Sequence, residues 1–214
     1  MNEKDVVVIG GGTAGFLSAQ FVTQRGGSVV IVEREKLGGI CPNWGCIPMC
    51  FMDRCVEVIR TVKDAGSYGI DTGELHIDYR KVIEEKEKTV RGVVAGMEAR
   101  LKATGVPVVR GSARIVSPEH VEIVTDKGKT EIIEAGKIII ATGSRSRRYD
   151  VPGAYGDGVL TARELLELTE LPKSLAIIGR SVAALEIASI WANLGSTVSL
   201  IARKPRLLPN EDEE

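Results

Sequence analysis

Val6-Val7-Val8-Ile9-Gly10-Gly11-Gly12-Thr13-Ala14-Gly15 is the stretch that decides the fold of this chain. The β-branched run from Asp5 to Ile9 is typical of a buried parallel strand. The glycines that follow have the spacing G-x-G-x-x-G, and they lead into the apolar-periodic run from Phe16 to Val22, which predicts a helix. The stretch therefore predicts the strand, turn and helix that open a dinucleotide-binding unit.

Each glycine of this motif has a separate role in such a unit. Gly10 allows the tight turn, Gly12 lets the backbone approach a pyrophosphate, and Gly15 permits close packing of the helix on the strand. A second strand, Ser28 to Val32, ends in Glu33, about 20 residues beyond the glycines, where a carboxylate accepts hydrogen bonds from a ribose. We expect the dinucleotide to contact Gly10, Gly12, Thr13, Ala14, Gly15 and Glu33.

A second informative stretch is Gly38-Gly39-Ile40-Cys41-Pro42-Asn43-Trp44-Gly45-Cys46-Ile47-Pro48. A regular helix cannot bridge Cys41 and Cys46, because residues five apart point in different directions. We therefore expect Cys41 in an irregular approach and Cys46 in the first turn of a helix, where Pro48 is tolerated. The positive end of that helix favours a thiolate. The pair is interpreted as a redox-active dithiol.

Composition limits the other classes of function. The chain has 214 residues, 43% of them hydrophobic, and a formal net charge of -1, so we expect a globular protein without a nucleic-acid or membrane partner. The N-terminus shows no leader and no apolar span, which favours the cytoplasm. All four cysteines fall within residues 41–55, which argues against a disulfide framework and for a local redox or metal site.

The middle of the chain predicts two helices and a set of strands. The helices are expected from Cys46 to about Ala65 and from about Asp78 to Thr104, with the charged run 84–88 as a solvated face. A buried strand ends in the small residues 141–144, which would let backbone approach a ligand. The strands before it form a small antiparallel insert. Strands are expected over 106–110, 113–116, 120–125, 130–133 and 137–140.

The last third of the chain predicts a second, degenerate nucleotide-binding start. A strand over 174–178 is followed by Gly179, a helix over 185–194 and a strand over 197–201. Ser181 and Ala184 replace two of the three glycines. Arg203 follows the second strand, where an NAD site would have an acid, so NADP is preferred, with an ordinary basic surface turn as the alternative.

Two segments are expected to lie outside these units. Residues 145–148 and 151–153 are interpreted as a linker, and the basic run 145–148 is interpreted as an exposed connector, with a phosphate-binding patch as the alternative. The acidic tail 210–214 is expected to be disordered.

These residues together resemble the flavoprotein disulfide reductases, which include dihydrolipoamide dehydrogenase, glutathione reductase and mercuric reductase. The resemblance rests on VVVIGGGTAG, Glu33, LGGICPNWGCIP, IIIATGS and LPKSLAIIG, in that order. It implies an α/β fold: a Rossmann-like FAD-binding domain over residues 1–148 with a small antiparallel β insert, and the incomplete start of an NAD(P)-binding domain over 149–214. The segment over 175–203 looks closest to the mercuric reductase branch.

The resemblance also implies roles for residues in the site. Cys46 would lie against the flavin and Cys41 would exchange with the substrate, a small-molecule disulfide, a dithiol or a metal ion. Electrons would pass between NADPH or NADH, FAD, the disulfide and this substrate. The further cofactor contacts it implies are Gly39, Ala113, Thr142 and Gly143 for FAD, and Gly179, Ser181 and Arg203 for NAD(P).

The sequence departs from this family in two ways. Cys50 stands where the family usually has a lysine, one helical turn beyond Cys46. The family is also about twice as long, and its later Gly-Asp motif and His-Glu pair have no counterpart here. We therefore expect a fragment or a split subunit, assembled as a homodimer or with a partner chain that supplies the C-terminal half.

Two alternatives follow from the same residues. Cys41, Cys46, Cys50 and Cys55 are spaced C-x4-C-x3-C-x4-C and could form a metal or iron–sulfur module, although such sites favour tighter spacings. The chain could also be a non-catalytic FAD-binding subunit, which would bind flavin without cysteine-dependent turnover.

Overall fold

The computed structural model describes residues 3–209 and 211–212. The described residues divide by their packing into two compact units. Unit 1 comprises the described residues within 1–47 and 90–145, and unit 2 comprises those within 48–89 and 146–214. The functional division at residue 148 that the sequence suggests remains a proposal. Within the described part of the chain, no helix has both the length and the apolar character that a membrane span requires.

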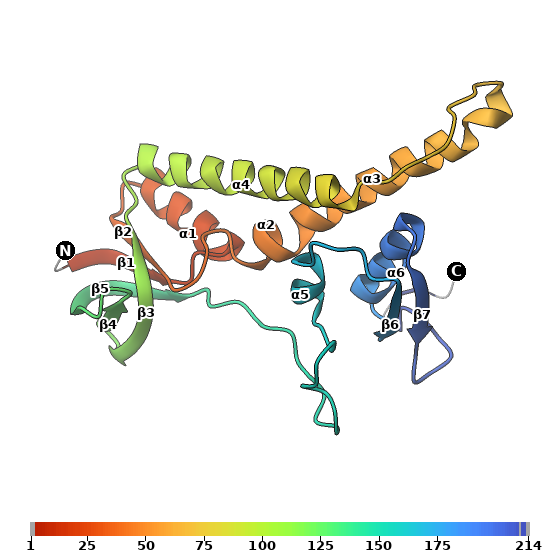
Figure 1. The fold of residues 1–214 in the computed structure, drawn as a ribbon. Helices are drawn as coiled ribbons and strands as arrows, with labels where there is room; N and C mark the ends of the chain where they lie inside the picture. Colours follow the sequence, from red (N-terminus) through yellow and green to blue (C-terminus); the bar gives the residue numbers. More distant parts are fainter. Residues whose placement is uncertain (1–2, 210, 213–214) are drawn as a thin grey trace. The chain divides into compact units, whose positions relative to one another are not determined.

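Unit 1 is built on five strands (Figure 1). Parallel pairing joins β3 to β2, β2 to β1 and β1 to the second half of β5. Antiparallel pairing joins β4 to the second half of β3 and to the first half of β5, which closes the circuit of strands. The strands are β1 (Glu3–Ile9), β2 (Val29–Glu33), β3 (Val108–Ser117), β4 (His120–Thr125) and β5 (Thr130–Ile140).

Strand β2 and the last three residues of β1 are buried on both faces, as their continuous β-branched sequences require. One face packs on α1 (Thr13–Gln24) and on the C-terminal part of α4 (Tyr79–Ala103), and its core includes Val8, Ile31 and Leu101. The other face packs on the antiparallel strands, in a core with Val7, Ile9, Val30, Val32, Val121, Ile123, Ile133 and Ala135. This burial fixes the carboxyl ends of β1 and β2, and the glycine-rich loop begins at the end of β1.

Unit 2 contains a second, smaller sheet. Strands β6 (Ser174–Ile178) and β7 (Thr197–Ile201) pair in parallel, and α6 (Val182–Leu194) packs on them. The core of the unit joins α6 to α5 (Ala162–Leu166), to α3 (Cys46–Asp64) and to the first turns of α4. Its largest fully buried side chain is Trp191. The turn η1 (Ala65–Tyr68) follows α3.

Several expected elements are confirmed, and others are wrong. The antiparallel pairing expected of the insert is present, but the strands expected over 106–110 and 113–116 form one strand, β3, and those expected over 130–133 and 137–140 form one strand, β5. The charged run 84–88 is not all solvated, since Lys86 is buried and donates to the carbonyl of Leu166. Arg148 is not an exposed connector residue, because it forms two hydrogen bonds with the Glu164 carboxylate. Residues 210, 213 and 214 of the acidic tail lie outside the described residues.

Candidate functional site

The glycine-rich loop lies between β1 and α1, and its backbone is packed too tightly for side chains. Gly10 has φ +106°, and a Cβ there would lie 2.2 Å from the carbonyl oxygen of Ala141. A Cβ on Gly15 would lie 1.9 Å from the carbonyl oxygen of Gly10. Gly12 is the N-cap residue of α1 and has no such backbone collision. The loop therefore leaves the start of α1 open.

The exposed residues Thr13 and Ala14 form the first turn of α1. The N–H groups at the start of a helix have no partner within the helix, and the helix dipole makes this end attractive to anions. Gly12 provides no side-chain cap. The loop is thus suited to hold the pyrophosphate of a dinucleotide.

Glu33 is the buried acidic residue of unit 1, and its carboxylate is held in place by backbone donors. The N–H of Gly11 donates to Oε2 at 2.6 Å, and the N–H of Glu35 donates to Oε1 at 2.6 Å. The side chain is 8% exposed. A carboxylate has about four acceptor positions, so both oxygens can still accept from ribose hydroxyls. The bond from Gly11 ties this acid directly to the glycine-rich loop, and the sequence motif does not reveal it.

The segment before the cysteines docks on the same loop. The N–H of Gly38 donates to the carbonyl of Gly11 at 2.8 Å, and Gly12 and Gly38 form an isolated parallel bridge. Gly39 has φ +64°, and a Cβ there would lie 2.8 Å from Cα of Gly12. The glycines of the two sequence motifs therefore form one continuous surface without side chains.

The two cysteines of the predicted dithiol occupy consecutive helices. Cys41 is the second residue of the short helix α2 (Ile40–Trp44), so the expectation of an irregular approach is wrong at this residue. Cys46 is the first residue of α3, as expected, and Pro48 lies in its first turn. Gly45 separates the helices. All four cysteines are present as thiols, and Cys46 and Cys50 are exposed.

Cys55 has a different environment from the cysteines of the dithiol segment. Burial raises the pKa of its thiol, which disfavours the reactive thiolate. Among the residues described, there is no group of three or more His, Cys, Asp and Glu side chains arranged to hold a metal ion. The geometry thus offers no support for the four-cysteine metal module.

The remaining predicted FAD contacts of unit 1 lie just after β5 and on β3. Ala141 donates its N–H to Ile9 at 2.8 Å, which places the following Thr142 and Gly143 next to the end of β1. Thr142 and Gly143 are exposed, and Gly143 has φ +67° with open space around it. Ala113 lies opposite Ile123 on β4 and packs against the second core. Thr142 and Gly143 therefore lie near the glycine-rich loop, whereas Ala113 lies in the antiparallel part of the strands.

The second nucleotide loop, in unit 2, begins at Gly179. Its N–H donates to the carbonyl of Ile201, at the end of β7, at 3.0 Å. Ser181 is the N-cap of α6 and accepts from the N–H of Ala184 at 3.4 Å. Arg203 follows β7 and is exposed. The predicted order of strand, loop, helix and strand is thus present, and a serine caps the helix where a nucleotide-binding motif would have a glycine.

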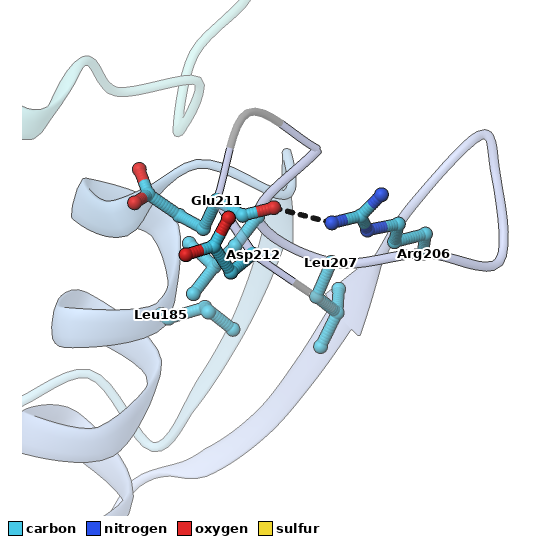
Figure 2. A pocket seen from close by; sticks show the side chains of 6 residues that line it. Leu185, Arg206, Leu207, Glu211 and Asp212 are labelled. Carbon is cyan, nitrogen blue, oxygen red and sulfur yellow. Dashed lines mark hydrogen bonds between the residues drawn. The ribbon is translucent and has the colours of Figure 1, made fainter. Parts of the chain in front are cut away.

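A hollow of about 510 Å³ lies beside α6 (Figure 2). It is lined by Leu185 and by residues after β7, among them the carboxylates of Glu211 and Asp212. Arg206 borders it and donates to the carbonyl of Glu211. Two carboxylates make this hollow unsuited to a phosphate, so it is not assigned to the nucleotide.

The comparisons with known proteins cover nearly the whole chain. The sequence model of a family described as "Pyridine nucleotide-disulphide oxidoreductase" matches residues 4–214. The dihydrolipoyl dehydrogenase of Zymomonas mobilis subsp. mobilis is 34% identical over 98% of this chain and 45% of its own length. That of Bacillus subtilis is 36% identical over 98% of this chain and 46% of its length.

A shorter relative gives a similar match. The dihydrolipoyl dehydrogenase of Acholeplasma laidlawii is 36% identical over 99% of this chain and 63% of its own length. The chain therefore spans about half the length of the first two relatives and a larger share of the third.

Proposed function

Because this chain belongs to the pyridine nucleotide-disulphide oxidoreductase family, we propose that it is the FAD- and dithiol-bearing part of an NAD(P)H-dependent disulfide reductase of the dihydrolipoyl dehydrogenase kind. The observation that carries the proposal is the docking of the cysteine segment on the glycine-rich loop, through the Gly38 to Gly11 hydrogen bond and the contact of Gly39 with Gly12. A dinucleotide held by the loop would lie beside the segment that carries the thiols.

The residues of unit 1 fit FAD. Close backbone packing at Gly10 and Gly39 keeps side chains out of the loop, Gly12 leaves the start of α1 open, and the first turn of α1 would face the pyrophosphate of the cofactor. The carboxylate of Glu33, fixed by two backbone donors, would accept from the ribose. When bound, FAD supplies two-electron transfer between a nicotinamide and a disulfide.

The thiols of Cys41 and Cys46 then have separate roles. Oxidation of the pair forms one S–S bond and releases two protons and two electrons, and reduction reverses this change. Cys46, at the first residue of α3, has the positive end of a long helix beside it. We assign Cys46 to the flavin side and Cys41 to exchange with a substrate disulfide or dithiol. A metal-ion substrate of the mercuric reductase type is the second possibility.

The second loop is proposed to hold the nicotinamide dinucleotide. Gly179 and the Ser181 cap lie at the start of α6, and Arg203 follows β7, where its guanidinium suits a 2′-phosphate. This assignment favours NADPH. A chain that provides the remaining half, or a second copy, would complete the enzyme, with the cytoplasm as the proposed compartment.

The test measures flavin uptake and disulfide formation in the same preparation. Purified chain is titrated with FAD by visible absorption, and its thiols are counted before and after mild oxidation. The proposal expects saturable FAD binding and the loss of one pair of thiols in the wild type, whereas Cys41→Ser should keep all of its remaining thiols. Cys55→Ser is the matched control and should still lose the pair. Folded chain that takes up no FAD, or that loses no thiols, would contradict the proposal.

A further inference from the structure

We propose that Lys36 is a positioning residue for the dithiol. Its ammonium, placed on the ring of Trp44, holds the spacer between Cys41 and Cys46 in the conformation from which the pair closes to a disulfide. The inference rests on the proposed function, because it assumes that these two thiols form a redox pair, and it assigns a role to a residue outside the two sequence motifs.

The contact itself is a cation–π interaction within unit 1. Nζ of Lys36 lies 5.1 Å from the centroid of the Trp44 ring. Tryptophan is the aromatic side chain that attracts cations most strongly, and the attraction grows when the ring is shielded from water. Trp44 is 7% exposed, while Lys36 is exposed. The charge therefore stays in water and caps an indole that is otherwise buried.

A second brace joins the same two parts of the chain. Nδ2 of Asn43 donates to the carbonyls of Leu37 and Gly39, each at 2.9 Å. The N–H of Gly39 in turn donates to the carbonyl of Lys36 at 3.1 Å, which closes the turn. The turn at residues 36–39 thus contacts two adjacent residues of the spacer. Its backbone carbonyls accept from Asn43, and its Lys36 side chain lies on Trp44.

Trp44 transmits this restraint to the cysteines through Gly45. A Cβ on Gly45 would lie 3.4 Å from Cα of Cys41 and 3.2 Å from the carbonyl oxygen of Ile40, so Gly45 packs closely against the first turn of α2. Cys46 is the next residue. A disulfide needs its two Cα atoms within about 7 Å. Movement of Trp44 would therefore change the separation of Cys41 from Cys46, and the contact with Lys36 opposes that movement.

The test is the thiol–disulfide equilibrium of the pair with glutathione. In this reaction the Cys41–Cys46 disulfide takes two electrons from two glutathione thiols, which yields two protein thiols and one glutathione disulfide. Lys36→Met removes the ammonium and keeps an apolar stem. We expect the equilibrium to shift about 2- to 5-fold toward the dithiol, the range for an exposed cation–π contact. This corresponds to a reduction potential about 10–20 mV less negative.

Two further variants make the test specific. Lys36→Arg keeps a cation that stacks on tryptophan, and it should restore the wild-type potential. Arg25→Met is the matched control, because Arg25 lies 5.6 Å from the centroid of Phe21 at the end of α1 and makes the same kind of contact away from the thiols. Its potential should equal that of the wild type.

The outcomes separate this inference from the proposed function. A wild-type chain that forms no disulfide between Cys41 and Cys46 would overturn both. A wild-type pair whose potential is unchanged in Lys36→Met would overturn the inference alone. Equal shifts in Lys36→Met and Lys36→Arg would also overturn it, because the cation would then have no role. If Lys36→Met lowers the stability of the fold, Lys36→Gln provides a second uncharged side chain for the same comparison.

Discussion

Replacement of Glu33 by glutamine should weaken both the fold of unit 1 and its affinity for FAD. The carboxylate accepts from two backbone N–H groups at 2.6 Å and is 8% exposed. Glutamine has a single acceptor oxygen, and its NH₂ group would face the other backbone donor. The variant therefore keeps the size of the side chain and removes one buried, charge-assisted hydrogen bond.

The expected loss follows from the strength of such a bond. Hydrogen bonds to charged groups contribute about 1.5–3 kcal/mol, and an unsatisfied buried donor costs a similar amount. For a chain of this size, a loss of that magnitude lowers the melting temperature by roughly 3–10 °C. The FAD dissociation constant should rise at least about 10-fold, because the amide presents fewer acceptors to the ribose.

The assay combines thermal unfolding, followed by circular dichroism without cofactor, with FAD titration. Glu35→Gln is the matched control. Glu35 pairs with Arg145 at 3.5 Å on the surface, where such a pair contributes at most about 1 kcal/mol. If Glu33→Gln has the same melting temperature as the wild type and binds FAD equally well, the assignment of Glu33 to the cofactor site is refuted.

Three other substitutions test separate parts of the structure. Gly15→Ala should prevent FAD binding and destabilise unit 1 by at least about 3 kcal/mol, because the new Cβ would lie 1.9 Å from the Gly10 carbonyl; normal flavin content would contradict this. Lys86→Met should lower the free energy of unfolding in urea by about 1–2 kcal/mol, since it leaves the buried Leu166 carbonyl without its donor, and an unchanged midpoint would argue against that role. Hydrogen bonding, chiefly from the backbone N–H of its helix cap, holds the pKa of Glu164 below its usual range; its stabilising contribution is therefore present above the unfolded-state pKa and lost as the pH falls through the folded-state pKa. In Glu164→Gln, the free energy of unfolding should therefore fall less steeply as the pH is lowered. An unchanged pH dependence of unfolding would contradict this prediction.

The sequence predicts the elements of this fold better than their continuity. Strand β4 and strands β6 and β7 have the bounds that the β-branched runs indicate. The sequence predicts β3 and β5 each as two shorter strands, and the glycines Gly111 and Gly136 lie in the gaps between them. In the structure they mark close approaches of backbone: a Cβ on Gly111 would lie 2.4 Å from the Val124 carbonyl oxygen, and one on Gly136 would lie 3.0 Å from that of Asp5.

The charged run of α4 shows a second limit of sequence reasoning. A run of alternating charges predicts a solvated face, yet Tyr79, Ile83 and Lys86 are all buried. These residues are spaced four and three apart, which places them on one face of a helix. At Lys86, the helical spacing from Tyr79 and Ile83 therefore predicts burial better than the charge of the run does. The buried ammonium group donates to the Leu166 carbonyl.

In the candidate site, too, the sequence predicts some features, and others are visible only in the structure. The glycine pattern, Glu33 and the cysteine pair follow from local motifs, because each needs a particular residue type at a particular position. The bond from Gly11 to Glu33 and the contact of Lys36 with Trp44 depend on how the segments pack. No spacing rule predicts them, so they become visible only in the structure.

The central claim is that a flavin held by the glycine-rich loop exchanges electrons with the pair Cys41 and Cys46. Anaerobic reductive titration of the oxidised, FAD-loaded chain tests it most directly. The account predicts uptake of about four electron equivalents by the wild type, two for the flavin and two for the disulfide, and about two by Cys41→Ser. Uptake of about two equivalents by both proteins, or a folded chain that cannot be loaded with FAD, would contradict it.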